Sequence, residues 1–450
     1  MIATRVLLAT LLSACVGAGA AHFTIAPGGT VTVPGGSLAL GCADLAVQGT
    51  MSLGASQVTG AGTVSIAGGG SLDAGSSSIT VGGNWANAGT FAAGTGAVVF
   101  ADGCTSAPAT FTGTTAFRNL SLTSATGRGF VLPVGALVSV SGALSLTGTA
   151  VQPLQVTSAT PGQAANLVMG AAGTISRSFA SFASGAAIDA TAFPRLANIS
   201  TRMQVLTGND VLIGGFIIGG TESKTVVVRA RGPSLVPFGV ANAVANPRMD
   251  LFSGQAVIAS SDDWGGNANA AAVQASGFAP SSALESAILT TLAPGAYTAV
   301  VSGVGNVTGV GIIEVFEVDK PEAPLANIST RGQVLTGGDV MIGGFIIQGS
   351  APKTVVVRAR GPSLVPFGIA NALQDPVLQL FAGQAVIASN DDWQAQAVPG
   401  DVAAIQASGF APADTREAVI RVTLQPGAYT AIVTGKNGGV GVGIVEVFAQ

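Results

Sequence analysis

Hydrophobic and polar residues alternate over short stretches through the first part of the chain. In residues 21–183 these stretches are four to six residues long, and turns such as PGG, AGGG and VGG separate them. Alternation of this kind predicts β-strands with one buried face, because successive side chains point to opposite sides of a strand. The expected strands lie at 30–33, 37–40, 44–47, 50–53, 63–66, 78–81, 97–100, 117–122, 137–140 and 143–146.

Successive strands in this region are often only six to eight residues apart. That spacing is tighter than in a typical sandwich or barrel, so it favours a parallel β-solenoid in which each turn of chain stacks on the last. GGNWANAGTF (82–91) and GTGAVVF (94–100) resemble turns in the glycine-rich β-helical regions of secreted bacterial surface proteins. The alternative is an irregular β-sandwich.

The rest of the chain contains one domain-sized unit twice. Leu196 begins LANISTRMQVLTG and Leu325 begins LANISTRGQVLTG, an offset of 129 residues that becomes 132 after Trp393. An internal repeat of this length is a domain rather than a rung of a solenoid. We therefore expect a connector at 184–195, copy 1 at 196–319, a proline-containing linker at 320–324 and copy 2 at 325–450.

Each copy carries about eight short alternating stretches. In copy 1 they are QVLTG, DVLIGGFIIGG, KTVVVRARG, MDLFSG, QAVIASS, SAILTTL, AYTAVVSG and VGIIEVFEV. Eight strands in a unit of this size predict a β-sandwich. The whole chain is thus expected to be all-β, with an N-terminal parallel β-solenoid (β-helix) followed by two tandem β-sandwich domains.

The second half of each copy resembles a known family. QAVIASSDDW followed by LESAILTTLAPGAYTAVVSG is similar to the pre-peptidase C-terminal type of bacterial β-sandwich. The front half, ANISTR to RARGPSL, resembles a repeat at the C-terminal end of many large secreted bacterial proteins. These resemblances imply extracellular, non-catalytic attachment, although no protease or collagenase domain lies upstream here.

Composition and the N-terminus agree with an extracellular chain. Only 9% of residues are charged, and 18 Lys plus Arg without a basic stripe exclude nucleic-acid binding. No internal apolar run is long enough to span a bilayer. Residues 1–20 predict a secretory signal peptide, cleaved after Ala18-Gly19-Ala20 or at a lipobox that would place a lipid anchor on Cys15.

Removal or lipidation of Cys15 leaves an even pair of cysteines. Cys42 and Cys104 are therefore expected to form a disulfide in an oxidising compartment, and the alternative is two buried free thiols.

A repeated Asp-Asp-Trp turn is the candidate metal site. Carboxylates supply the hard oxygen ligands that Ca²⁺ prefers. The candidate ligands are Asp262, Asp263 and Glu285 in copy 1 and Asp391, Asp392 and Glu417 in copy 2. The spacing does not match a standard calcium loop, so the alternative is an Asx-type turn whose tryptophan covers the edge of the sandwich.

A repeated Arg-Ala-Arg sequence is the candidate ligand-binding surface. Two arginines that lie two residues apart on a strand share one face. With the tryptophans of the turns, the candidate residues are Arg229, Arg231 and Trp264 in copy 1 and Arg358, Arg360 and Trp393 in copy 2. They would bind an anionic glycan or a carboxylate. The alternative is an ion-pair network with acids found in both copies, such as Glu314 and Glu446.

Residues for catalysis are scarce. His22 is the only histidine, which excludes a histidine-rich metal centre and leaves no triad of the usual type. We expect a secreted or cell-surface structural and adhesive protein whose sandwiches bind a glycan or matrix component, without a cofactor unless calcium binds. The alternatives are a polysaccharide-active enzyme with its site on the solenoid, and a purely structural stalk capped by the sandwiches.

Overall fold

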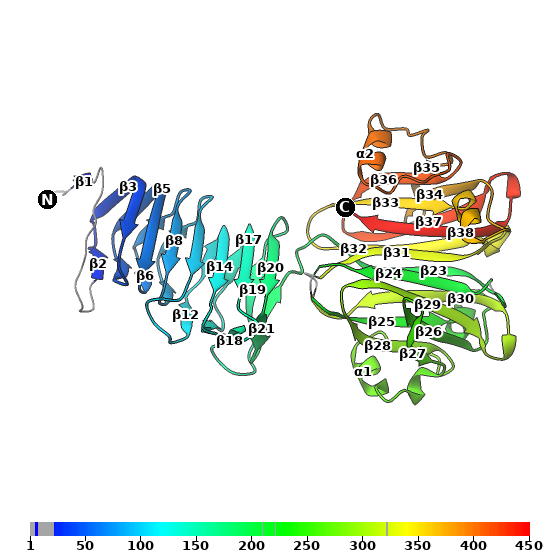
Figure 1. Ribbon diagram of the computed structural model, residues 1–450, viewed down its shortest axis with the longest axis horizontal. Helices are drawn as coiled ribbons and strands as arrows, with labels where there is room; N and C mark the ends of the chain where they lie inside the picture. The colour runs from blue at the N-terminus through cyan, green and yellow to red at the C-terminus, as the bar shows by residue number, and fades with distance from the viewer. Residues whose placement is uncertain (1–4, 8–21, 209, 221, 321–322) are drawn as a thin grey trace. The chain divides into compact units, whose positions relative to one another are not determined.

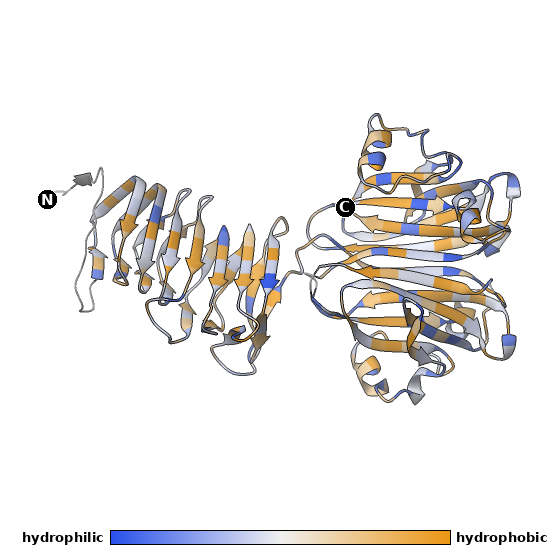
Figure 2. Cartoon of the chain, in the orientation of Figure 1, coloured by the Kyte–Doolittle hydropathy of each residue, from blue (hydrophilic) through white to orange (hydrophobic). Residues whose placement is uncertain are grey.

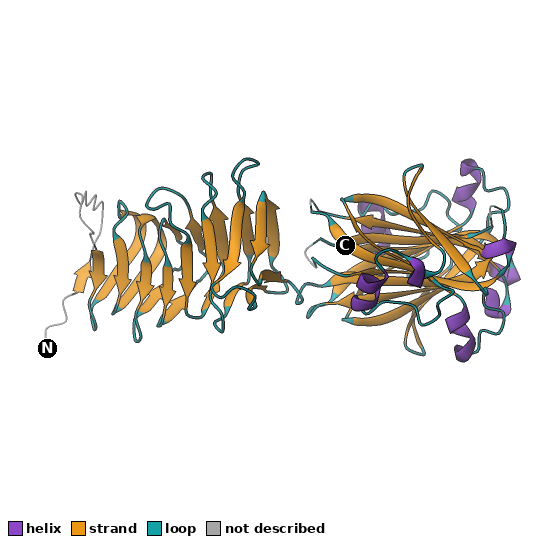
Figure 3. Ribbon diagram, turned by 90° about the horizontal axis from the view of Figure 1, so that it is seen from below, coloured by secondary structure: helices purple, strands orange, loops and turns teal. Residues whose placement is uncertain are grey.

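The computed structural model describes residues 5–7 and 22–450, apart from residues 209, 221 and 321–322. The chain divides into two compact units, Met1–Phe193 and Pro194–Gln450, and strands dominate both (Figures 1 and 3). In the described residues, no helix is long and apolar enough to cross a membrane. The signal peptide and the lipidation of Cys15 remain predictions, since Cys15 and both cleavage sites lie outside the described residues.

The first unit is a parallel β-solenoid, as the sequence predicts. Its strands form three parallel sheets because each turn of chain places its strands beside those of the previous turn. The first sheet contains β1 (Arg5–Leu7), β3 (Thr30–Ala39), β5 (Thr50–Ala61), β8 (Ser78–Val81), β11 (Ala97–Phe100), β14 (Asn119–Thr123), β17 (Ala143–Thr147) and β20 (Thr174–Ser178), with β7 (Ser71–Asp73) and β10 (Thr90–Ala92) beside it.

The other two sheets complete the turns. The second contains β2 (His22–Ile25), β4 (Asp44–Val47), β6 (Val64–Ile66), β9 (Trp85–Asn87), β12 (Ala109–Thr112), β15 (Gly129–Leu132), β18 (Leu154–Ser158) and β21 (Ala180–Ala183). The third contains β13 (Thr115–Phe117), β16 (Val138–Val140), β19 (Ala165–Met169) and β22 (Ala186–Asp189). The last strand runs into the segment that the sequence pattern assigns to a connector.

Parallel pairing aligns equivalent residues of successive turns into ladders. One buried ladder consists of Ile79, Val98, Leu120 and Leu144, and an outward ladder beside it consists of Thr80, Val99, Ser121 and Ser145. Figure 2 shows this alternation along the strands. Glycine is required where corners stack: a Cβ on Gly94 would lie 2.0 Å from the carbonyl oxygen of Gly75, and the φ angle of Gly94 is +54°.

The second unit is a sandwich of two antiparallel sheets, each with eight strands. One sheet has the order β28 (Ser286–Leu292), β25 (Lys224–Arg231), β30 (Gly309–Glu317), β23 (Arg195–Val205), β32 (Met341–Gln348), β37 (Gly427–Gly435), β34 (Pro376–Ala382), β35 (Ala385–Asn390). The other has the order β27 (Ala256–Ser261), β26 (Pro247–Ser253), β29 (Gly295–Gly303), β24 (Leu212–Ile218), β31 (Leu325–Val334), β38 (Gly441–Ala449), β33 (Lys353–Arg360), β36 (Ala418–Leu424).

Helices occur only as short elements in the loops of the described part of this unit. They are α1 (Ala270–Ala275), α2 (Asp401–Ala407), η1 (Pro233–Phe238), η2 (Trp264–Gly266), η3 (Val304–Asn306), η4 (Gly337–Asp339), η5 (Pro362–Phe367) and η6 (Lys436–Gly438). The alanine-rich stretch 267–278 contains α1.

Each sheet takes four strands from copy 1 and four from copy 2, which the sequence analysis did not anticipate. β23 pairs with β32, and β24 pairs with β31, so both sheets continue from one copy into the other. Buried residues of both copies form one hydrophobic cluster. The first two strands of each copy therefore form a seam between the copies.

Equivalent residues meet across this seam. Thr330 donates a hydrogen bond to its own counterpart Thr201 (Oγ1–Oγ1 2.8 Å). Two further hydrogen bonds are reciprocal: Gln204 donates to Asp339 (2.9 Å) and Gln333 to Asp210 (3.0 Å). Such exchange of equivalent contacts is the signature of a two-fold interface.

One pair of equivalent positions breaks this symmetry. Position 203 is methionine in copy 1, and the equivalent position 332 is glycine in copy 2. A Cβ on Gly332 would lie 2.5 Å from Cε of Met203, which is 1% exposed. The methionine side chain therefore fills the space that the absent side chain of Gly332 leaves.

Candidate functional site

The two Asp-Asp-Trp turns follow β27 and β35. Trp264 is half-buried, and its indole N–H donates to the carbonyl oxygen of Ser282 (3.1 Å). Trp393 is 5% exposed and packs in a small hydrophobic cluster with Ile405 and Phe448. Both tryptophans thus cover the sandwich, as in the turn alternative.

The two glutamates assigned to the candidate metal site lie beside the turns, where their carbonyl oxygens accept from the backbone N–H groups of Trp264 (2.9 Å) and Trp393 (2.8 Å), but their side chains point elsewhere. Glu285 is fully buried, and its Oε1 accepts hydrogen bonds from the backbone N–H groups of Gly232 (2.8 Å) and Ser234 (2.9 Å). In copy 2, Glu417 makes the same two bonds to Gly361 and Ser363. These carboxylates hold the turns that lead into η1 and η5.

A different acid joins the turn in copy 2. Among the described residues, the acidic side chains whose oxygens approach one another closely enough for a shared cation are Asp375, Asp391 and Asp392, within 4.8 Å. The Nζ atom of Lys436 lies 2.7 Å from Asp391 Oδ2 and 3.6 Å from Asp375 Oδ2. Lys436 already supplies the positive charge that these carboxylates attract, and calcium binding here stays a prediction.

The electrostatics of this cluster are coupled. Burial raises the pKa of Asp375 above its usual value; Lys436 opposes the shift, and Asp391 and Asp392 add to it. The hydrogen bond to Asp391 raises the pKa of Lys436. The lysine is thus held in its charged form beside two carboxylates, while ionisation of Asp375 is disfavoured.

Copy 1 builds the same corner without the extra charges. Asn246 stands in place of Asp375, and Val304 stands in place of Lys436. With its amide turned to suit its neighbours, Asn246 donates to Asp262 Oδ1 (3.1 Å) and to the carbonyl oxygen of Leu284 (3.0 Å). An acid and a base thus replace two uncharged residues together, a signal that alignment of the two copies could have revealed.

Arg229 is enclosed by structural partners. Its Nε donates to Glu314 Oε2, and its Nη1 donates to the carbonyl oxygen of Phe278 (2.7 Å). The guanidinium lies 4.7 Å from the ring centroid of Phe316, which stacks on Phe278 (centroids 4.4 Å apart). The two rings belong to SGFAP (276–280) and EVF (314–316), sequences that recur in copy 2, and sequence reasoning missed their stacking.

Arg231 belongs to the same network. Its Nε donates to Ser234 Oγ (2.9 Å), and its Nη1 lies 3.8 Å from Glu314 Oε2. Copy 2 repeats every contact with Arg358, Arg360, Ser363, Phe410, Glu446 and Phe448. The four arginines therefore match the ion-pair alternative in geometry: Arg229 and Arg358 have glutamate, carbonyl and aromatic partners, and Arg231 and Arg360 have a serine hydroxyl and the same glutamates.

The aspartates of the solenoid each cap backbone N–H groups. The pairs are Asp44 with Thr63 (2.7 Å), Asp73 with Gly75 (3.0 Å), Asp102 with Ala125 (2.8 Å) and Asp189 with Thr191 (3.1 Å). His22 lies beside Asp44, with Nδ1 3.4 Å from Oδ2. In the described solenoid, none of these four belongs to a group of three or more His, Cys, Asp or Glu side chains that could hold a metal ion.

Asp102 and Arg128 occupy one corner of the solenoid. Burial opposes ionisation of Asp102, but hydrogen bonds from Ala125, Ser124 and Thr126 outweigh it and lower its pKa. Arg128 is 3% exposed and donates to the carbonyl oxygens of Ala107 (2.7 Å) and Gly83 (3.2 Å). The guanidinium of Arg128 therefore serves as a hydrogen-bond donor to backbone carbonyl groups at this corner.

A disulfide joins Cys42 and Cys104, with the Cα atoms 5.3 Å apart. The bond connects residues 62 positions apart in sequence, across several turns of the solenoid. Closing a loop of this length restricts the unfolded chain and stabilises the fold by roughly 2–4 kcal/mol.

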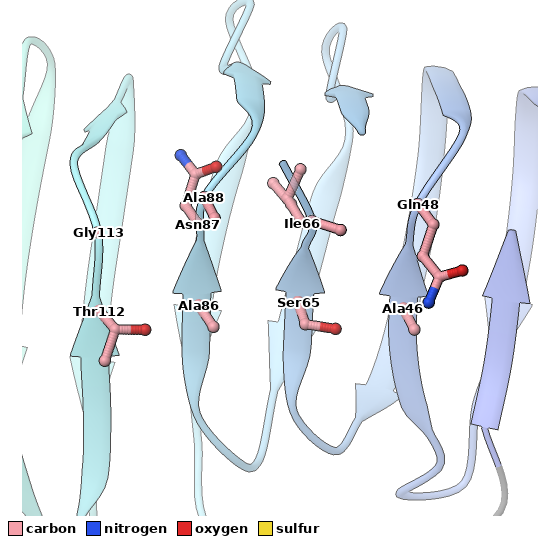
Figure 4. Close-up of a pocket in the computed structure, with 10 residues that line it drawn as sticks. Ala46, Gln48, Ser65, Ile66, Ala86, Asn87, Ala88, Thr112 and Gly113 are labelled. Carbon is pink, nitrogen blue, oxygen red and sulfur yellow. The ribbon is translucent and has the colours of Figure 1, made fainter. Parts of the chain in front are cut away.

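A shallow hollow of about 490 Å³ lies on the sheet that contains β4, β6, β9 and β12. Figure 4 shows its row of small outward residues, Ala46, Ser65, Ala86 and Thr112, with Gln48 at one end. No residue of its lining is titratable in the physiological range, so the hollow itself offers no general acid or base.

The chain was compared with protein-family models and with curated proteins. Neither comparison finds a match.

Proposed function

We propose that this chain is a secreted or cell-surface, non-catalytic attachment protein. Its solenoid would act as a stiff spacer, and its paired sandwich copies would hold an extracellular glycan or matrix component. The observation that carries the proposal is the use of charge: solenoid aspartates cap backbone turns, and Arg229 and Arg358 have glutamate, carbonyl and phenylalanine partners. Catalytic carboxylates would instead be paired or exposed in a groove.

Two further observations support an extracellular location. The disulfide between Cys42 and Cys104 is of a kind that persists in oxidising compartments. The resemblance of the sandwich sequence to pre-peptidase C-terminal modules also favours attachment, since those modules are secreted with the proteins that carry them.

The hollow on the solenoid does not favour the enzyme alternative. Its lining consists of small residues and amides, including Ala86, Asn87 and Gly113, and lacks the acid and base that polysaccharide cleavage requires. A stalk that only spaces the sandwiches remains the simpler alternative, and binding measurements separate the two.

The test uses the full-length chain on a panel of immobilised polysaccharides and matrix proteins. We expect retention on at least one member of the panel and no release of reducing or unsaturated sugar ends over prolonged incubation. Release of sugar ends would contradict the non-catalytic assignment. Absence of retention on every member would leave the stalk alternative.

A further inference from the structure

The elements η1 and η5 present a phenylalanine to solvent in both copies. Phe238 is 79% exposed and Phe367 is 77% exposed. Hydrophobic residues make up 48% of the chain, but few of them are aromatic. Both lie in the sequence GPSLVPFG, which is identical in the two copies. Exposed aromatic side chains on a folded surface commonly mark binding sites.

The exposed phenylalanine is fixed to the sandwich from beneath. The fully buried Glu285 binds the N–H groups at the start of η1, and Leu235, 4% exposed, anchors its middle. Gly239 ends the element in the left-handed region (φ +87°) and donates to the carbonyl oxygen of Val236 (3.0 Å). The ring of Phe238 is therefore held on a rigid element, which reduces the entropy lost when a ligand binds.

Two loops of copy 1, residues 236–246 with Phe238 and residues 304–308, contain no charged residue, although Asp262 accepts a hydrogen bond from Asn246 beside them. The loops contact each other, since Val304 N–H donates to the carbonyl oxygen of Asn246 (2.9 Å) and Val310 N–H to that of Asn242 (2.8 Å). We call this surface the end patch.

The end patch combines apolar side chains with amides. Val236, Val304 and Val307 are 52%, 37% and 43% exposed, and the side chains of Asn242 and Asn306 are also exposed. An amide offers both donors and acceptors. A lipid surface would strip water from these amides without replacing the hydrogen bonds, which is unfavourable.

We propose that the end patch of each copy binds a neutral glycan. The phenylalanine ring matches the apolar face of a sugar ring, and the amides match its hydroxyl groups. The uncharged loops of copy 1 offer no attraction to an anionic polymer, and the nearby Arg229 and Arg231 are paired with Glu314. This inference rests on the proposed attachment function and names its ligand class.

Copy 2 carries a related patch. Phe367, Asn371 and Asn437 are exposed there. Its loops also carry Lys436 and Asp375 in place of Val304 and Asn246, and Lys436 is paired with Asp375 and Asp391. Two patches on one chain would raise the apparent affinity for a polymer that reaches both, because the second contact is intramolecular.

The test compares the full-length chain with the variant Phe238→Ala/Phe367→Ala. Binding is measured by affinity electrophoresis with a neutral β-glucan, dextran, the anionic polysaccharide alginate and phosphatidylcholine vesicles. We expect the wild-type chain to bind a neutral glucan, and the double variant to bind it at least about tenfold more weakly at an unchanged melting temperature. Phe179→Ala, which removes a phenylalanine that is 54% exposed on the solenoid, is the matched control and should bind like wild type.

Three outcomes would overturn the inference. Unchanged binding by the double variant, or binding to alginate or vesicles alone, removes the end patch as a neutral-glycan site while attachment stands. If the wild-type chain binds no polysaccharide and no matrix protein, the inference falls together with the proposed function.

Discussion

Copy 1 and copy 2 contain the same strands and the same arginine network, yet equivalent residues have different partners where their neighbours differ. Lys224 is fully buried: its Nζ lies 3.0 Å from Glu317 Oε2 and donates to the carbonyl oxygen of Asp319 (2.6 Å). Its counterpart Lys353 is half-buried, Ala449 stands in place of Glu317, and burial lowers the pKa of Lys353. An identical local sequence thus fixes the strand but not the electrostatic environment of its side chains.

The arginine network should contribute equally to the free energy of unfolding in both copies. Replacing Arg229 or Arg358 with methionine leaves a largely buried glutamate without its main partner, which costs roughly 3–5 kcal/mol. We expect the two single variants to lose similar free energies of unfolding in urea denaturation. Arg248→Met, at a side chain that is 53% exposed, is the control and should stay within about 0.5 kcal/mol of wild type. Losses below about 1 kcal/mol, or unequal losses, would show that the network is not the shared structural element.

At the seam, the two copies carry different residues at equivalent positions, Met203 and Gly332, so each position should accept a different substitution. Gly332→Met should clash with Met203 and cost about 2–3 kcal/mol, and Met203→Gly should leave a cavity at a similar cost. The exchanged variant Met203→Gly/Gly332→Met should recover most of this loss, because the two-fold seam offers each position the same surroundings. Thermal and urea unfolding of the four proteins give this double-mutant cycle. Additive losses in the exchanged variant would contradict the pairing of the two sites.

Substitutions at Asp375 and at its counterpart Asn246 should give the smallest change in the free energy of unfolding. Because the folded-state pKa of Asp375 is raised, its protonation favours folding: this contribution is complete below the usual value of 3.8 and is lost as pH rises through the folded-state pKa. Asp375→Asn should therefore stabilise the chain at pH 7 by less than about 1 kcal/mol and lose that advantage on acidification. The matched change in copy 1, Asn246→Asp, should destabilise at pH 7 and recover at low pH. Melting curves between pH 3 and pH 7 test both signs.

The sequence predicted local structure well because alternation is a local signal. The solenoid, the antiparallel sandwich strands and the turn after Ser261 follow from side-chain period and glycine placement. The seam could not be predicted this way, because β23 pairs with β30 of its own copy on one side, and its alternation would be the same whether or not β32 paired with its other side. Pairing between residues more than a hundred positions apart leaves no mark on local pattern.

The candidate sites were predicted less well, for a related reason. Sequence reasoning placed Glu285 and Glu417 beside the Asp-Asp-Trp turns, and their backbone carbonyls do bond the turns, but their carboxylates point to the backbone of Gly232 and Gly361. The direction of a side chain depends on which buried donors need a partner, and that is decided by tertiary packing. Asp375 escaped notice because it lies sixteen positions before Asp391 and stands in place of an asparagine in copy 1.

The contact between Met203 and Gly332 has a consequence for the history of the chain. A fresh duplication yields two interchangeable halves, and recombination between them can overwrite either one without harm. Once one half carries Met203 and the other Gly332, copying one half over the other places two methionines or two glycines at the contact. Copying either half over the other is therefore expected to destabilise the seam, so the two copies are not interchangeable at this contact.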